Sequence, residues 1–414
     1  MFAQDSKLTW QKAAEFLVIA AVFFLPISTA MLEISILAAV FCWAVHSVRY
    51  GYPIELIKKN SIAWLFLAFF CLFLLGSSYT EASSTAVCTM LLKYKKFLLV
   101  FFLFPLLAGE RMAYRCTIAL LSSIVLTLFL SYSQYFLEPL FHKNFQDSGV
   151  FKDHIFTGFL FAFASYSFTL LFIFTKRWRW LFGLLSLLTI YNVFFINLGR
   201  SAYPVFVALT CLLGWQLTRW KGLSLAVLIV GLILGNVTLF SHAFKQRSLE
   251  GLHNIQDYEQ HKKKITSLGL RLSFYQNSFQ LIKAHPFFGY GTASFEKNYA
   301  RTTHYGPDTR NPHNEYLNIT VQFGLFGLSI LLLLFYIHAL ESTHLPKLQG
   351  FFAQAVLVSI ATGSLVNSWL MDVTQGYFYV LLTAISFANL VRYKRKVDSN
   401  ATPVDFRQQT AKFS

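Results

Sequence analysis

A histidine lies where a polar segment of the chain meets a long apolar run. His313 follows Asn311 and Pro312, and apolar residues predominate from Leu317 onward. An imidazole, whose ordinary pKa is about 6.5, can take up and release a proton near neutral pH. Ionisable groups are costly inside a bilayer, so one placed where a wet loop enters a membrane span is a candidate functional group. The pattern predicts that His313 is a general base; the alternative is a histidine that packs against the helix or caps it.

Two arginines lie in positions that fit an anionic ligand. Arg200 is in the segment 197–201, between two apolar runs, and Arg271 opens the segment 271–282, whose apolar residues recur at helical spacing. A guanidinium keeps its charge and offers paired donors to a phosphate. An arginine at membrane depth is costly unless it has a partner or reaches water, and a phosphate would supply the partner for Arg200. The alternative is that this side chain simply extends to the outer surface.

Further polar residues are predicted to contact the substrate. Asn314 and Tyr316 either orient His313 or bind the ligand, or else satisfy backbone groups at the helix end. Two arginines of the long polar loop are predicted to contact phosphates, and three lysines at the start of a predicted span either line a cavity or belong to an interfacial helix. The predicted substrate-binding residues are Asn314, Tyr316, Arg301, Arg310, Lys93 and Lys96, with Lys95 the third lysine of the span.

The composition indicates an integral membrane protein. Hydrophobic residues make up 55% of the 414, 45 are phenylalanine, and only 13% are charged; the mean hydropathy is +0.50. So few charges cannot cover a soluble surface of this size. The first apolar run, at 13–31, lacks a small-residue cleavage site and is long enough to span, so it is interpreted as a transmembrane helix rather than a signal peptide.

The chain divides into about twelve apolar spans, since roughly 20 apolar residues cross the hydrocarbon core. Lysine and arginine gather in alternate short loops, which places both termini on the cytoplasmic side. The predicted fold is an all-α polytopic membrane protein, a single transmembrane domain over residues 1–414 with a basic cytoplasmic tail at 393–414. The predicted span centres are Val22, Val40, Phe69, Phe101, Ile124, Phe163, Leu187, Leu209, Val230, Gly327, Ser359 and Leu382.

A long polar loop at 241–312 is predicted on the periplasmic side and is expected to contain short helices. Its basic excess favours an anionic ligand such as a phosphate or an acidic glycan, although the lysine run at 262–264 could equally be a solvated surface. The helix that begins at Arg271 should end at His285-Pro286, and Gly289-Tyr290-Gly291 should turn the chain.

Several classes of site are not supported by the sequence. The five cysteines have no paired spacing, and the histidines of the polar loop have no i,i+4 partners, so neither a disulfide framework nor a metal site is predicted. Nucleotide-binding glycine motifs are absent, and no cofactor or nucleic-acid partner is expected. Acidic residues within the spans are scarce, which makes transport the weaker class of function.

One block of residues resembles a known family. His313-Asn314, then nine residues, then Gly324-x-x-Gly327 follow a long external loop, and Pro286-x-x-Gly289-x-Gly291 precedes them. This pattern resembles the signature of the O-antigen ligases and of the related O-antigen polymerases and O-linked oligosaccharyltransferases. The resemblance covers about residues 192–328, and it does not separate the members of the superfamily.

The resemblance implies a GT-C-like, metal-independent glycosyltransferase of the Gram-negative inner membrane whose active site faces the periplasm. Its donor would be O-antigen linked to undecaprenyl pyrophosphate, and its acceptor the lipid A-core oligosaccharide. His313 would be the general base, and Arg200 and Arg271 would bind the diphosphate. The sequence offers no paired-carboxylate nucleophile, so inversion at the anomeric carbon is predicted. The two glycines at 324 and 327 are expected to let helices pack closely.

The superfamily leaves alternatives open. A ligase is favoured by the short basic tail, because many protein-modifying oligosaccharyltransferases carry a large additional domain. A polymerase uses the same donor and differs only in its acceptor, so it is the second hypothesis. An O-linked oligosaccharyltransferase and a transporter of lipid-linked glycan follow.

Overall fold

The computed structural model describes residues 2–141, 149–197, 199–240, 249, 267–302 and 309–398, and all regular secondary structure in these residues is helical. The lysine run at 262–264 and the tail beyond 398 lie outside the described residues. The helices are α1 (Phe2–Phe24), α2 (Thr29–Tyr50), α3 (Glu55–Lys58), α4 (Ser61–Gly76), α5 (Ser84–Tyr94), η1 (Lys95–Leu99), α6 (Val100–Leu106), α7 (Glu110–Phe141), α8 (His154–Phe174), α9 (Arg179–Tyr191), η2 (Asn192–Ile196), α10 (Ala202–Phe240), α12 (Ser267–Ala284), α13 (Phe295–Thr302), α14 (Glu315–Ser342), α15 (Lys347–Gly363), α16 (Val373–Phe387) and α17 (Leu390–Asp398).

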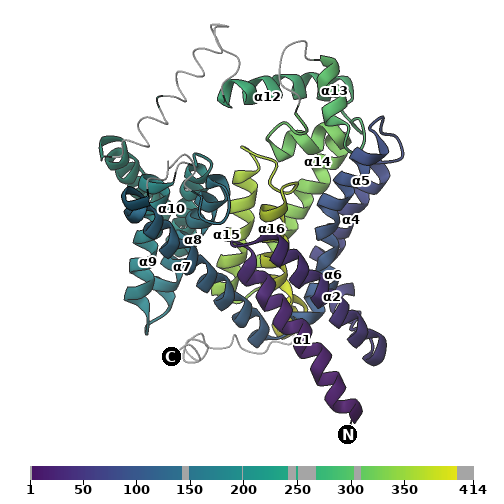
Figure 1. Ribbon diagram of the computed structural model, residues 1–414, viewed down its shortest axis with the longest axis horizontal. Coiled ribbons are helices and arrows are strands. Elements are labelled where there is room, and N and C mark those ends of the chain that lie inside the picture. The colour runs from purple at the N-terminus through teal and green to yellow at the C-terminus, as the bar shows by residue number, and fades with distance from the viewer. Residues whose placement is uncertain are drawn as a thin grey trace.

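The helices form two groups joined by α15 and α16 (Figure 1). Helices α7 to α10 lie on one side and α4, α5 and α14 on the other, while α12 and α13 lie across one end of the molecule. Helix α15 contacts both α10 and α14, and it also contacts α16. The chain segments before and after the long polar loop are thereby held in one helical body.

Six helices among the described residues are long and apolar enough to cross a membrane: α2, the 110–137 part of α7, α8, α9 with η2, α10 and α14. All twelve predicted span centres lie in helices. Helix length alone does not confirm twelve spans, because α4, α15 and α16 have only 16, 17 and 15 residues. The count of twelve and the periplasmic placement of the loop therefore stay predictions.

Helix α10 consists of two arms that fold back on each other. Thr218 and Arg219 have non-helical backbone angles, with Arg219 at φ 55° and ψ −130°. A Cβ atom on Gly214 would lie 2.3 Å from the carbonyl oxygen of Gly222. Residues eight apart in an unbroken helix are separated by about 12 Å along the axis, so this contact requires the chain to reverse. The two arms correspond to the two spans predicted around Leu209 and Val230.

The segment with the three lysines is one nearly continuous helical path through α5, η1 and α6. Lys95 is exposed and Lys93 is half-buried, but Lys96 is only 2% exposed. The Lys96 ammonium donates hydrogen bonds to the backbone oxygens of Asp372, at 2.5 Å, and of Met371, at 3.4 Å. Lys96 is thus inside the protein, where it holds the loop that precedes α16.

The turn between α12 and α13 packs against the middle of α14. Helix α14 is interrupted at Gly324, which has φ 63° and ψ −161°. At this break the N–H of Leu325 donates to the carbonyl of Pro286 at 2.7 Å, and the N–H of Gly291 donates to the carbonyl of Gln322 at 2.7 Å. The turn therefore satisfies backbone groups that the break would otherwise leave without partners.

The glycines of the motif at 286–327 have identifiable structural roles. Helix α12 ends at Ala284, next to the predicted end, and Gly289 and Gly291 have positive φ as a turn requires. A Cβ on Gly327 would lie 3.2 Å from Leu72 on α4, which confirms a close helix contact. Gly324 packs against the α12–α13 turn and not against a neighbouring helix.

We expect Gly324→Ala to destabilise the protein. A Cβ at this position would lie 2.2 Å from the backbone carbon and oxygen of Phe287, and the positive φ adds strain of roughly 1–3 kcal/mol. Thermal unfolding in detergent should show a lower midpoint. The control is Gly231→Ala in α10, where nothing lies within 4 Å of the added Cβ and a small gain of stability is expected. Equal midpoints for Gly324→Ala and the wild type would contradict this account.

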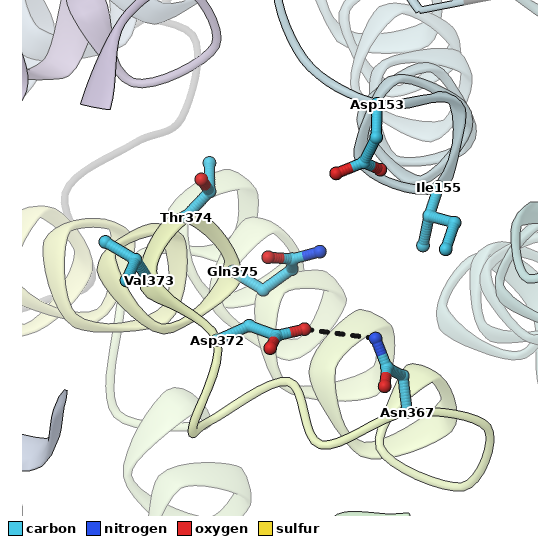
Figure 2. A pocket seen from close by; sticks show the side chains of 7 residues that line it. All are labelled: Asp153, Ile155, Asn367, Asp372, Val373, Thr374 and Gln375. Atoms are coloured by element: carbon cyan, nitrogen blue, oxygen red, sulfur yellow. Dashed lines mark hydrogen bonds between the residues drawn. The ribbon is translucent and has the colours of Figure 1, made fainter. Parts of the chain in front are cut away.

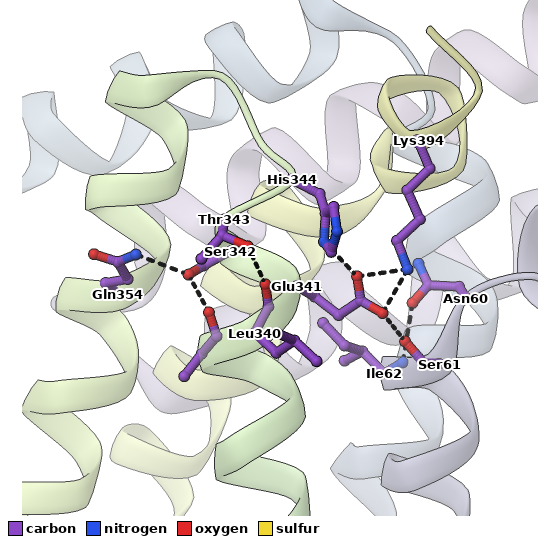
Figure 3. A network of polar contacts seen from close by, with 11 residues as sticks. Asn60, Ser61, Ile62, Leu340, Glu341, Ser342, Thr343, His344, Gln354 and Lys394 are labelled. Atoms are coloured by element: carbon purple, nitrogen blue, oxygen red, sulfur yellow. Dashed lines mark hydrogen bonds and ion pairs between the residues drawn. The ribbon is translucent and has the colours of Figure 1, made fainter. Parts of the chain in front are cut away.

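The two ends of α14 carry different polar groups. Glu341, in its last turn, accepts hydrogen bonds from Ser61 and from Lys394 of α17, and His344 lies 3.2 Å from the same carboxylate (Figure 3). At 1.5 Å per residue, a 28-residue helix extends roughly 40 Å, so this network lies far from the first turn of α14. His313 is at that opposite end.

Candidate functional site

His313 is held in an unusual backbone conformation just before α14. Its φ is 52°, in the left-handed region that side chains other than glycine and asparagine rarely adopt. The N–H of His313 donates to Oδ1 of Asn311 at 2.8 Å, and its carbonyl accepts from the Tyr275 hydroxyl at 3.3 Å. The imidazole stacks on Phe274 of α12, with 5.8 Å between ring centres. The loop and α12 together fix the direction of the imidazole.

A chain of side-chain hydrogen bonds determines which nitrogen of His313 carries the proton. Nδ1 of His313 lies 2.9 Å from Oδ1 of Asn367, and Nδ2 of Asn367 donates to Oδ2 of Asp372 at 3.0 Å. A carboxylate only accepts, so the Asn367 amide must turn its nitrogen to Asp372 and its oxygen to His313. The imidazole then donates from Nδ1, which leaves the lone pair of Nε2 available as a base.

Burial and neighbouring charges favour the protonation states that these hydrogen bonds require, a neutral imidazole on His313 and an ionised carboxylate on Asp372. Burial lowers the pKa of His313 below 6.5, the Asn367 bond raises it, and the charge of Arg271 lowers it. Burial raises the pKa of Asp372 to about 6, while Lys96 and Lys93 oppose that shift. At pH 7 the imidazole is therefore neutral and the carboxylate is largely ionised.

The structure places Arg271 close enough to both His313 and Arg200 for their charges to interact. Burial lowers the pKa of Arg271, Tyr275 opposes that shift, and the positive charge of Arg200 lowers the pKa further. Within the described part of the chain no carboxylate pairs with Arg271. Two neighbouring guanidinium groups repel each other, so an anion between them would remove an unfavourable interaction. The three predicted catalytic residues are thus electrostatically coupled.

Asn314 and Tyr316 are engaged with the protein backbone. The Asn314 side chain caps α14 by accepting from the N–H of Leu317 at 3.0 Å, and its amide nitrogen donates to the carbonyl of Leu365 at 2.9 Å. The Tyr316 hydroxyl donates to the carbonyl of Ala361 at 2.8 Å. These contacts hold α14 to α15 and to the loop that follows it.

The other two arginines predicted to bind substrate, Arg301 and Arg310, lie on the surface near carboxylates. Arg301 forms an ion pair with Glu81 at 2.9 Å, and Arg310 lies 3.7 Å from Glu296. Both guanidinium groups are more than half exposed, so these pairs are weak and their charges remain open to solvent. Their predicted role in substrate binding stays a prediction.

Sequence reasoning missed the contribution of the loop between α15 and α16. Asn367 and Asp372 lie there, and the sequence analysis singled out neither residue. The loop is anchored by Glu315, whose Oε2 accepts the N–H groups of Leu370 and Met371 at 3.1 and 3.2 Å. An asparagine and an aspartate at the entry to a predicted span were the available signal.

A cavity of about 240 Å³ opens beside this chain of hydrogen bonds (Figure 2). It lies between the start of α8 and the loop that leads into α16. The residues that line it are Asp153, Ile155, Asn367, Asp372, Val373, Thr374 and Gln375. The hydrogen-bond partner of His313 therefore also faces a space that a ligand can enter.

We expect Asn367→Ala to slow the reaction of this site and to change its pH dependence. An imidazole N–H left without its partner costs roughly 1–3 kcal/mol, which corresponds to about a ten- to hundredfold loss of kcat/KM. The Asn367 bond raises the pKa of His313, so its loss lowers that pKa and moves the acid limb of the rate profile to lower pH. Initial rates between about pH 5 and 8 test this. A profile identical to the wild type would show that Asn367 does not orient the imidazole.

Helices of membrane-crossing length indicate a membrane protein, and its candidate site has the imidazole of His313 near Arg271, whose charge also interacts with that of Arg200. Residues 184–332 match the family model described as O-antigen ligase. This segment includes Arg200, Arg271 and His313. Over these residues the match confirms the resemblance to the O-antigen ligase superfamily seen in the sequence. No curated protein matches the chain significantly.

Proposed function

We propose that the protein is an O-antigen ligase of the Gram-negative inner membrane. It transfers O-antigen polysaccharide from undecaprenyl pyrophosphate to the lipid A-core oligosaccharide at the periplasmic face. The observation that carries the proposal is the oriented, neutral His313 near Arg271, which in turn interacts with Arg200, within the part of the chain that matches the family. A lipid-linked diphosphate donor needs both positive charge and a base, and this site offers both.

In the proposed reaction an acceptor hydroxyl oxygen forms a bond to the anomeric carbon of the donor. The bond from that carbon to the diphosphate oxygen breaks, and undecaprenyl pyrophosphate leaves with the bonding electron pair. Nε2 of His313 takes the hydroxyl proton, because Nδ1 already carries a proton and donates it to Asn367. The step balances in charge and atoms without a further reactant.

The arginines have the complementary role of stabilising the leaving group. Negative charge develops on the diphosphate as the bond breaks, and donors aimed at that charge lower the barrier. Arg271 and Arg200 supply two permanent positive charges that do not depend on pH in the physiological range. The proposal is therefore metal-independent.

A single displacement inverts the anomeric configuration. Retention would need a carboxylate nucleophile on the face opposite the leaving group, paired with an acid about 5 Å away. The oriented group at this site is an imidazole, and Asp372 is bonded to Asn367. We therefore propose inversion, which NMR of the newly formed linkage can test.

Lipopolysaccharide profiles of a null strain, with and without the wild-type gene, test the proposed function. For a ligase, the null strain accumulates lipid A-core without O-antigen, together with polymerised glycan on undecaprenyl pyrophosphate. Core that carries a single repeat unit would identify a polymerase instead. A normal profile in the null strain would contradict both functions.

A further inference from the structure

The cavity beside Asn367 is lined by the side-chain amide of a mostly buried residue. Gln375, in the first turn of α16, is only 5% exposed. Its side chain has no hydrogen bond to any described residue, and it lines the cavity. Figure 2 shows the amide between Asp372 and two residues at the start of α8, the capping residue Asp153 and Ile155. The amide atoms are not among the buried polar atoms without a partner, so they are open to the cavity, where an amide can both donate and accept hydrogen bonds to a ligand.

The lining favours a ligand with hydroxyl groups over an anion. Two carboxylates, on Asp153 and Asp372, face the cavity, and no lysine or arginine is among its lining residues. A diphosphate would be repelled there, whereas hydroxyl groups can donate to carboxylates and exchange hydrogen bonds with amides. The volume of about 240 Å³ is below the range of roughly 300–1,000 Å³ for sites of larger ligands, which suits one sugar ring.

The cavity lies next to the hydrogen-bond partner of His313, the proposed base. Asn367 lines the cavity with one end of its side chain near Asp372, and its oxygen is 2.9 Å from Nδ1 of His313. A sugar in the cavity is therefore one side chain away from the imidazole. Arg271, which is not part of the lining, acts on His313 from outside the cavity.

We propose that this cavity binds a sugar ring of the acceptor oligosaccharide on the Nδ1 side of His313, so that a hydroxyl group on a neighbouring part of the acceptor reaches Nε2. Gln375 and Asp372 bond hydroxyl groups of that ring, and Ile155 packs against its C–H surface. The inference rests on the proposed glycan transfer, and it adds where the acceptor is recognised. Gln375 is the residue that distinguishes the acceptor from the donor.

Steady-state kinetics of the purified full chain with lipid-linked donor and lipid A-core acceptor test this assignment. Gln375→Leu should raise the KM for acceptor about tenfold, the effect of one lost hydrogen bond, and leave the KM for donor unchanged. The matched control is Gln280→Leu on the exposed surface of α12, for which both values should equal the wild type. If Gln375→Leu does not fold, Thr374→Val in the same cavity carries the same prediction. An unchanged KM for acceptor, or an equal rise for donor, would overturn it.

Binding without turnover separates this inference from the proposed function. Delipidated core oligosaccharide should bind His313→Asn protein, and the added Gln375→Leu change should weaken that binding about tenfold. If only an O-antigen repeat oligosaccharide binds, and Gln375→Leu weakens it, the acceptor cavity is supported and the ligase assignment fails. If core oligosaccharide binds equally to both proteins, the cavity assignment fails and the ligase assignment stands.

Discussion

His313→Asn should lower kcat for glycan transfer by about 10²- to 10⁴-fold, the usual contribution of a general base. The substitution removes the imidazole whose Nε2 is left free by the bond to Asn367. Asparagine is chosen because it tolerates the positive φ of 52° better than alanine does, so the backbone of the loop is preserved. Stacking on Phe274 is lost, but the N–H bond to Asn311 can remain.

The measurement is single-turnover transfer of lipid-linked glycan to lipid A-core by purified protein, with thermal unfolding recorded in parallel. The control is His285→Asn, which changes an exposed histidine that contacts Tyr290 edge to face and takes no part in the hydrogen bonds of His313. That variant should transfer glycan at the wild-type rate. Rates for His313→Asn within a factor of about three of wild type would exclude a general base at this position.

Arg271→Ala should lower kcat/KM by about 10²- to 10³-fold, as expected when one group that stabilises developing charge is removed. Arg271 has no carboxylate partner among the described residues, so its loss leaves no buried carboxylate without a counter-charge. Arg271→Lys should recover only part of the activity, because an ammonium keeps the charge but not the paired donors.

Arg271→Ala should also change the pH dependence of the reaction rate. The charge of Arg271 lowers the pKa of His313, so its removal raises that pKa and moves the acid limb of the rate profile to higher pH. The shift is opposite in sign to that expected for Asn367→Ala. The control is Lys283→Ala, an exposed cation on the same helix. Wild-type kinetics and an unshifted profile for Arg271→Ala would show that this arginine is remote from the reacting groups.

The helices were largely predictable because apolar runs are a local property of the chain. Helix α12 ends at Ala284 as the His285-Pro286 pair predicts, and the two arms of α10 match two predicted spans. Their lengths were not predictable. The break at Gly324 depends on backbone bonds from the α12–α13 turn, and the inward position of Lys96 depends on the loop before α16.

The sequence by itself indicated the membrane class, the resemblance to the O-antigen ligase superfamily, and the proposal of His313, Arg200 and Arg271 as site residues, because each follows from residue type and neighbouring pattern. Only the tertiary structure revealed Asn367 and the cavity. Asn367 is 54 residues from His313, and the two meet only when α14 packs against α15 and Glu315 anchors the connecting loop. A hydrogen bond at 2.9 Å depends on that packing, and no spacing along the chain encodes it.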